Sequence, residues 1–323
     1  MRRIVGIAIA VLLSLASIFA SPAYATTATT WHVQAGSVAF ASGLPLGGGN
    51  RFYPAAMAIH AGDSVVFTPV GPHTVTFNRP PVPLFALFGP INASPTAGTI
   101  SSPSMTVNSG FIGGGPGTYT LTFAATLPAG RYTVICGLHI GMSELIDLLP
   151  ASAHLPKTDA QYGAIAQSQI TRDLDTRADT AAAAREDFQD EDGSPTVWVG
   201  VGTKRVTTIR FFPESLTVHV GQTVTFLKTK DPTEPHTVTF GAEPADPVAQ
   251  LMARGGTTYS GVEDVSSGFL STPAQYAFYH LAGLPLPVAL TRYQLTFTKA
   301  GVFEYFCAIH DNEGMRATVH VIP

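Results

Sequence analysis

Charged residues are scarce in this sequence, and cysteine is scarcer still. Only 12% of the 323 residues are charged whereas 45% are hydrophobic, which argues against a disordered chain and predicts packed globular material. With 18 basic residues against 22 acidic ones, we expect no nucleic-acid partner. Two cysteines cannot build a disulfide-rich scaffold. Glycine (31) and proline (25) are plentiful by contrast, which favours many short strands joined by turns over long helices.

Long apolar runs are absent except at the N-terminus, where residues 1–25 have the pattern of a secretory signal peptide. Arg2 and Arg3 form a basic start, an apolar stretch follows, and Ala23-Tyr24-Ala25 is a small-residue cleavage site. Cleavage after Ala25 predicts an exported protein, periplasmic or extracellular, without a stable membrane anchor. A retained anchor is the alternative, and general secretion and twin-arginine export both stay open. The mature chain has 16 basic and 22 acidic residues, a formal net charge of −6.

An internal repeat organises the rest of the chain. When the sequence is aligned with itself, two halves match in an order that never breaks. We therefore expect one domain over residues 31–150, a second over residues 197–323, and a linker over residues 151–196. The matched segments are Arg51-Phe-Tyr-Pro54 with Arg210-Phe-Phe-Pro213, Ile59-His-Ala-Gly62 with Val218-His-Val-Gly221, Pro72-His-Thr-Val-Thr-Phe77 with Pro235-His-Thr-Val-Thr-Phe240, and Ser109-Gly-Phe111 with Ser267-Gly-Phe269.

Apolar and polar residues alternate within each half, as they do in half-buried strands. Leu216, Val218 and Val220, for example, alternate with threonine and histidine. No helix of comparable length is indicated inside either half, so we expect an all-β fold of antiparallel sandwiches or barrels. The same parity places His60 and His219 on outer, solvated faces.

The linker between the halves has a different composition. Residues 157–188 lack proline and are rich in alanine, with apolar residues at helical spacing, and Thr158 followed by Gln161 predicts a capping box. We expect a helical connector that leads into the acidic run at residues 186–192. A flexible, solvated linker is the alternative, because the apolar stripe is thin.

Each half contains one upstream histidine and a later cluster of cysteine, histidine and methionine. Two imidazoles, a thiolate and a thioether form a donor set that both Cu(I) and Cu(II) accept, so this pattern favours one mononuclear copper in each half. A disulfide between the two cysteines and a structural role for each are the alternatives. The candidate ligands are His73, Cys136, His139 and Met142 in the first half, and His236, Cys307, His310 and Met315 in the second.

Two ligand loops carry a resemblance to a known family. The stretches Cys136-Gly-Leu-His139-Ile-Gly-Met142 and Cys307-Ala-Ile-His310-Asp-Asn-Glu-Gly-Met315 resemble the copper loops of the cupredoxins plastocyanin, pseudoazurin and amicyanin. The resemblance covers residues 31–150 and 197–323. It implies two tandem Greek-key sandwiches, a type 1 copper in each, and electron exchange with a redox protein donor and acceptor. It also implies that His139 or His310 lies near the surface as the electron port.

The sequence departs from the family's pattern in two respects. Many members place asparagine directly after the upstream histidine, where it braces the cysteine loop, whereas this chain has Thr74 and Thr237 there. The bonding around each copper is therefore left open. The stretches 78–117 and 241–290 are also longer than in small cupredoxins, and we expect them to cover the copper end or to form a docking surface.

Two-domain copper proteins also include nitrite reductases and small laccases, which hold further copper through histidines beside the type 1 cysteine. Here Ile135 and Phe306 precede the cysteines, Gly137 and Ala308 follow them, and the sequence contains no His-X-His pair. We therefore expect an electron carrier and not an enzyme. A copper-binding or delivery protein without a redox role is the main alternative.

Overall fold

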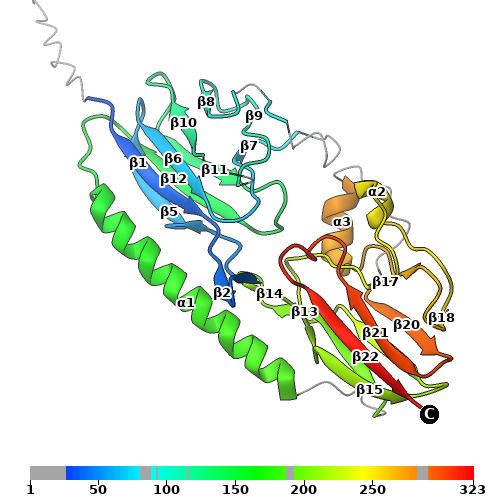
Figure 1. Cartoon of the computed structure of the whole chain (residues 1–323). Coiled ribbons are helices and arrows are strands. Elements are labelled where there is room, and N and C mark those ends of the chain that lie inside the picture. Colours follow the sequence, from blue (N-terminus) through cyan, green and yellow to red (C-terminus); the bar gives the residue numbers. More distant parts are fainter. Residues whose placement is uncertain are drawn as a thin grey trace, which may run out of the picture.

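The computed structural model describes residues 27–80, 89–91, 94–113, 115, 117–186, 193–281 and 290–323. The predicted signal peptide lies outside these residues, and the acidic run is described only at Glu186. Two β-domains lie side by side along the helix α1 (Asp159–Glu186), with the N-terminal domain beside its first half (Figure 1). None of the helices in the described part combines the length and the apolar character that crossing a membrane requires.

The first β-domain is a sandwich of two sheets. One has the strand order β4-β1-β6-β10-β8 and the other β5-β12-β11-β7-β9, while β2 and β3 form a separate hairpin. Because the chain crosses between sheets, β1 runs parallel to β6 and β12 runs parallel to β5. The strands are β1 (Thr30–Ala35), β2 (Ala39–Ala41), β3 (Leu44–Gly47), β4 (Phe52–Tyr53), β5 (Ala56–His60), β6 (Ser64–Pro69), β7 (Thr76–Phe77), β8 (Ala97–Ile100), β9 (Val107–Asn108), β10 (Tyr119–Phe123), β11 (Gly130–Ile135) and β12 (Ser143–Leu149).

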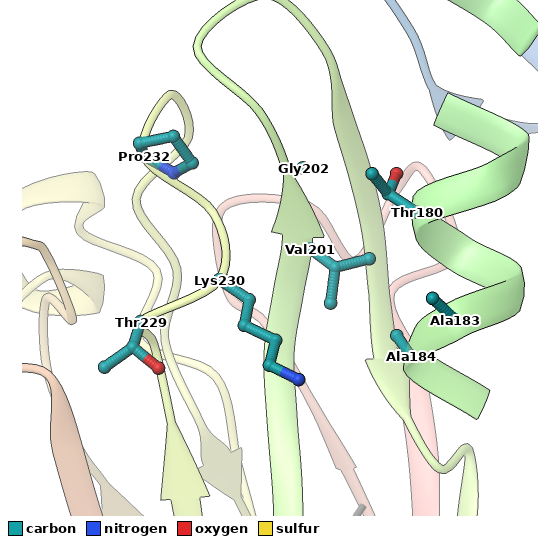
Figure 2. A pocket seen from close by; sticks show the side chains of 8 residues that line it. All are labelled: Thr180, Ala183, Ala184, Val201, Gly202, Thr229, Lys230 and Pro232. Carbon is teal, nitrogen blue, oxygen red and sulfur yellow. The ribbon is translucent and has the colours of Figure 1, made fainter. Parts of the chain in front are cut away.

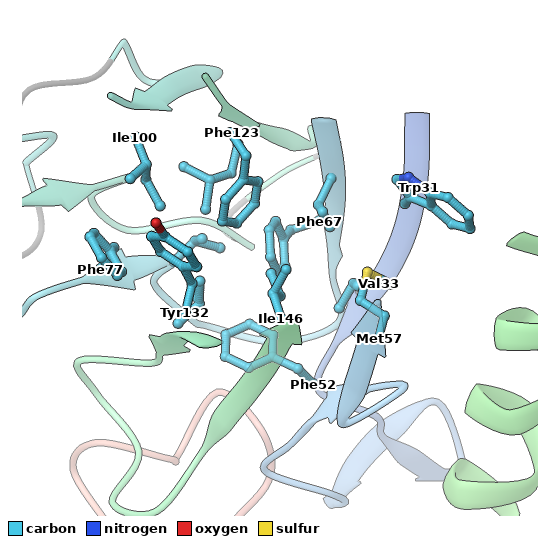
Figure 3. Packing of buried hydrophobic residues seen from close by; sticks show 14 of the residues in the cluster. Trp31, Val33, Phe52, Met57, Phe67, Phe77, Ile100, Phe123, Tyr132 and Ile146 are labelled. Atoms are coloured by element: carbon cyan, nitrogen blue, oxygen red, sulfur yellow. The ribbon is translucent and has the colours of Figure 1, made fainter. Parts of the chain in front are cut away.

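Alternation along these strands builds the core of the first β-domain (Figure 3). On β1, Trp31 and Val33 are buried while the residues beside them are exposed or half-buried, which is the period of a strand with one face in a core. Phe52 of β4 and Phe67 of β6 extend from the same sheet and meet edge to face in the core, with ring centroids 5.4 Å apart. Cys136 belongs to the same buried cluster, so the core extends to the end of the sandwich that carries the ligand loop.

The second β-domain repeats the two five-stranded sheets of the first, without a described counterpart of the hairpin β2-β3. Its sheets have the orders β14-β13-β16-β20-β18 and β15-β22-β21-β17-β19, each the counterpart of a sheet in the first domain. The prediction of an all-β chain with two sandwiches is confirmed. The expectation of antiparallel sheets is wrong in part, because each sheet also contains parallel strand pairs. The strands are β13 (Thr196–Gly202), β14 (Thr207–Phe212), β15 (Ser215–His219), β16 (Thr223–Leu227), β17 (Thr239–Phe240), β18 (Thr258–Tyr259), β19 (Val265–Ser266), β20 (Arg292–Phe297), β21 (Gly301–Phe306) and β22 (Arg316–Ile322), and the short helices are α2 (Pro247–Gln250) and α3 (Pro273–Leu281).

The helix predicted between the domains is confirmed, and it begins with the predicted capping box. The Thr158 N–H donates to Oε1 of Gln161 at 2.8 Å, and the Gln161 N–H donates to the Thr158 hydroxyl at 3.3 Å. The helix is a docked element, because the Tyr53 hydroxyl of the first β-domain donates to Asp173 at 2.8 Å. Near its C-terminal end, Ala181 and Ala184 pack in one buried cluster with residues of the second β-domain.

The two β-domains also contact each other directly. The Asn50 N–H donates to the Arg205 carbonyl at 2.8 Å, and the Thr207 N–H donates to the Gly48 carbonyl at 2.9 Å. The Arg210 guanidinium donates from β14 to the carbonyl of Pro45 on β3 at 2.8 Å. These contacts bring the loop between β11 and β12 close to the second domain, and the loop between β21 and β22 close to the first (Figure 1).

One prediction about the outer faces is wrong. His60 is 8% exposed, and a nitrogen of its ring lies 3.0 Å from the Ala153 carbonyl. Strand parity gives the correct face, but the segment after β12 folds over that face and covers the ring. His219, its counterpart in the second domain, is exposed as predicted.

Candidate metal centres

Centre 1, defined as His73, Cys136, His139 and Met142, forms at one end of the first sandwich. The two ring nitrogens Nδ1 of His73 and His139 lie 3.0 Å apart, and Sγ of Cys136 lies 3.8 Å from the first and 3.5 Å from the second. Met142 is 1% exposed and belongs to the same core cluster as Cys136. The structure thus brings three of the predicted donor atoms together and buries the fourth residue in the same core.

Centre 2, defined as His236, Cys307, His310 and Met315, repeats this geometry. The two Nδ1 atoms of His236 and His310 lie 3.2 Å apart, and Sγ of Cys307 lies 3.8 Å and 3.5 Å from them. Met315 is fully buried in the core cluster that contains Cys307. Both cysteines are free, so the alternative of a disulfide between them is wrong.

The spacing of the donor atoms fits a bound transition metal. Bonds of about 2.0 Å to nitrogen and 2.3 Å to sulfur, as for a zinc ion of similar size, separate donors in a trigonal plane by about 3.5–3.7 Å. The donor separations of 3.0–3.8 Å in the two centres surround those values. Two imidazoles and one thiolate, with a thioether in the same core, form the set that suits copper.

The local fold explains why each cysteine loop holds its shape. The hydroxyl of Thr74 accepts a hydrogen bond of 2.7 Å from the Gly137 N–H, directly after Cys136. Thr237 accepts one of the same length from the Ala308 N–H, directly after Cys307. The threonines also donate their own N–H groups to the two sulfurs, at 3.4 and 3.3 Å. Threonine therefore braces the cysteine loop in the place where the resemblance led us to expect asparagine.

A glycine supports the upstream histidine in each centre. A Cβ atom at Gly36 would lie closer than 3.0 Å to Nε2 of His73, and a Cβ atom at Gly200 would lie closer than 3.0 Å to Nε2 of His236. Both glycines have a positive φ, of +80° and +72°, which side chains rarely adopt. The end of β1 and the bulged strand β13 thus leave just the space that the imidazole ring occupies.

The two centres differ in what their upstream histidines contact outside the donor set. In centre 2, Nε2 of His236 lies 3.0 Å from Oδ2 of Asp231, which is fully buried. In centre 1, Nε2 of His73 lies 3.3 Å from the carbonyl oxygen of Val70. A carboxylate partner makes an imidazole a stronger metal donor than a carbonyl does. The repeat therefore preserves the donor atoms but not their surroundings.

The late histidines face each other across the domain interface, and Glu234 lies between them. Its Oε1 is 3.1 Å from Nε2 of His139, and its Oε2 is 4.0 Å from Nε2 of His310. The side chain of His139 is 7% exposed and that of His310 is 15% exposed. The expectation of a late histidine near the free surface is wrong in the docked chain, because each β-domain covers the other's loop.

The pKa values of the cysteine and the late histidine differ between the two centres, and Glu234 lies closer to His139 than to His310. Burial alone would lower the pKa of His139, but Glu234 and Cys136 outweigh it and hold that pKa well above its usual value. Burial likewise opposes ionisation of Cys136, but the pair with His139 lowers its pKa well below the usual range. In centre 2, burial raises the pKa of Cys307 to about 11, and burial together with His236 lowers the pKa of His310 to about 4.

A cavity of about 270 Å³ lies between the β-domains and reaches both centres. Its walls include His73, His139, His310 and Glu234. A larger hollow of about 500 Å³ lies between α1 and β13, where Thr180, Val201, Lys230 and their neighbours line it (Figure 2). None of the residues lining that hollow belongs to either centre, so its size does not make it the functional site.

Sequence reasoning missed Asp231 and Glu234. The signal was present, since Pro72 follows Gly62 by 10 positions whereas Pro235 follows Gly221 by 14. The longer segment of the second copy, between Gly221 and Pro235, contains both carboxylates. The two supporting glycines, directly after β1 and within β13, belong to matching segments of the repeat and could have been found in the same way.

The comparisons with known proteins are limited to solved structures, since no family model and no curated protein matches the chain. A mutant plastocyanin of fern is 21% identical over 39% of this chain and 99% of that chain, with a TM-score of 0.24. The oxidised plastocyanin from Dryopteris crassirhizoma is 22% identical over 39% and 99%, with a TM-score of 0.23. A mutant of amicyanin with Cu(I) is 22% identical over 41% and 86%, with a TM-score of 0.24.

The strand topology and the position of the donors indicate the fold of each β-domain. Each domain has the same two-sheet sandwich, and each carries its histidine, cysteine and histidine donors together at one end, in the loops before β7 and β17 and after β11 and β21. Each of the two β-domains therefore has a cupredoxin-like fold.

Proposed function

We propose that the protein is an exported blue-copper protein that transfers electrons through one mononuclear copper in each β-domain. The observation that carries this proposal is the repeated convergence of two imidazole nitrogens and one thiol sulfur within 3.8 Å of one another. His73, Cys136, His139 and Met142 would hold one copper. His236, Cys307, His310 and Met315 would hold the other. Copper in such a site exchanges one electron between Cu(I) and Cu(II).

The residues around the donors support electron transfer because they hold the donors still. Thr74 and Thr237 fix the backbone after each cysteine, while the missing side chains of Gly36 and Gly200 leave the space that the upstream imidazole occupies. A site that changes little between two oxidation states exchanges electrons with little reorganisation. We propose a redox protein as donor and another as acceptor.

We propose a carrier and not an enzyme, since the residues flanking each cysteine are Ile135 and Gly137 in one loop and Phe306 and Ala308 in the other. Oxidases and reductases need a copper with an open coordination position, and histidines beside the cysteine usually help to hold it. Capture or delivery of copper is the second candidate function. The observation that favours it is the burial of His139 and His310, the residues through which a partner would reach the metal.

Copper titration of the mature protein tests the proposal. We expect two coppers per chain, an intense thiolate-to-copper absorption band, and a band that a reductant bleaches and an oxidant restores at constant copper content. Copper that binds but leaves the protein upon reduction, for example to a Cu(I) chelator, would favour delivery instead. A protein that binds no copper would contradict both functions.

A further inference from the structure

Glu234 belongs to neither donor set, yet its carboxylate lies between the two centres. Its side chain is 11% exposed, and its two oxygens face Nε2 of His139 at 3.1 Å and Nε2 of His310 at 4.0 Å. The amide of Asn50, in the first β-domain, donates to Oε1 at 2.6 Å.

The backbone holds Glu234 in this position. Oδ1 of Asp231 accepts hydrogen bonds from the Thr233 N–H at 3.0 Å and from the Glu234 N–H at 3.1 Å, which closes a tight turn. The other oxygen of Asp231 lies beside His236. One short loop of the second β-domain therefore supplies a carboxylate to a histidine in each centre, Asp231 in its own domain and Glu234 in the other domain.

The first β-domain has no equivalent of this carboxylate. Gly71 stands directly before Pro72 and His73, where Glu234 stands before Pro235 and His236. Among the described residues, an acidic side chain of the second domain therefore contacts centre 1, whereas no acidic side chain of the first domain contacts centre 2. The long stretch 241–290 of the second domain also reaches the loop of centre 1. In this stretch, the Tyr279 hydroxyl of α3 donates to the Leu138 carbonyl at 2.8 Å.

We propose that Glu234 is a positioning residue of centre 1 supplied by the second β-domain, so that copper binding in centre 1 depends on the contact between the two domains. This inference rests on the proposed function. A carboxylate that accepts the Nε2 hydrogen of His139 leaves Nδ1 free to bind the metal and makes it a stronger donor to Cu(II). His310, at 4.0 Å, gains less. By linkage, copper in centre 1 strengthens the domain contact to the same extent.

The test uses the full chain with one thiolate removed at a time. In a Cys307→Ser background, centre 1 alone keeps its thiolate, and competition with a Cu(II) chelator gives its affinity. We expect Glu234→Gln to weaken Cu(II) binding there by about 10-fold or more, the usual loss when a partner of a ligating histidine is removed. The reduction potential of centre 1 should become more positive, because Cu(II) loses more than Cu(I). Glu304→Gln, the same charge change at an exposed position of β21, should leave both unchanged.

A second variant and a second background keep the inference open to refutation. Asn50→Ala removes the hydrogen bond to Oε1 without changing charge, and it should shift affinity and potential in the same direction if Glu234→Gln fails to fold. In a Cys136→Ser background, Glu234→Gln should weaken centre 2 less than centre 1. An unchanged affinity and potential in centre 1, or equal losses in both centres, would overturn the inference alone. A Cys307→Ser protein without a copper–thiolate band would overturn the proposed function and this inference with it.

Discussion

Replacing Gly200 with alanine should damage centre 2 and leave centre 1 intact. The added Cβ atom would lie closer than 3.0 Å to Nε2 of His236 and 2.9 Å from Oδ2 of Asp231, so the imidazole must move. The left-handed backbone, at φ +72°, costs an alanine about 1–2 kcal/mol. Displacing His236 removes a partner from the buried carboxylate of Asp231, which costs about 1–3 kcal/mol more. We expect the free energy of unfolding to fall by about 2–5 kcal/mol in all.

Gly221→Ala is the matched control for this substitution. Gly221 lies in the turn before β16 at φ +86°, and a Cβ atom there would meet nothing within 4 Å. It should therefore cost the backbone contribution alone and keep both coppers. Urea unfolding gives the two free energies, and the thiolate band reports each centre. If Gly200→Ala keeps the full band and is as stable as Gly221→Ala, the supporting role of the glycine is wrong.

Three further predictions concern stability. Thr237→Val leaves the buried Ala308 N–H without its acceptor and should cost about 1–3 kcal/mol in urea unfolding, whereas a loss below about 0.5 kcal/mol would contradict the bracing role. Thr158→Ala removes the helix cap and should cost about 1 kcal/mol in the same assay, and an unchanged midpoint would show that the cap is dispensable. Glu144 is fully buried, neither of its oxygens has a hydrogen-bond partner among the described residues, and burial raises its pKa well above its usual value. The folded protein then binds a proton that the unfolded chain has released, so stability should fall as pH rises above about 4.3. Glu144→Gln should flatten that fall and be the more stable protein at pH 7, and identical pH profiles would contradict the assignment.

The sequence was sufficient to predict which atoms meet within each β-domain. His73 and Cys136 are 63 positions apart, but strand parity and the order of the repeat indicate that both lie inside the same end of one sandwich. The sequence shows a threonine directly after each upstream histidine, but the role of these threonines stayed open. Their bracing hydrogen bonds depend on the backbone course of the cysteine loop, which no pattern of residue types specifies.

The arrangement of the two domains could not be predicted in this way. The hydrogen bond between Asn50 and Glu234 joins residues 184 positions apart, and neither residue belongs to a periodic pattern. The contact arises from how the surfaces of two separately folded sandwiches fit together along α1. Strand parity describes one domain at a time and does not show what covers a face, which is why His60 was predicted to be at the surface. The resemblance, which implied a late histidine near the surface, likewise does not describe the contact between the two domains.

Copper binding by single-cysteine variants tests the central claim most directly. Wild-type protein, Cys136→Ser and Cys307→Ser are titrated with copper while the thiolate band and the metal content are followed. Two independent centres predict two coppers in the wild type, with a band that each substitution reduces to about half. A band of unchanged intensity after either substitution, or a wild-type protein with no band at all, would contradict a copper–thiolate centre in each β-domain.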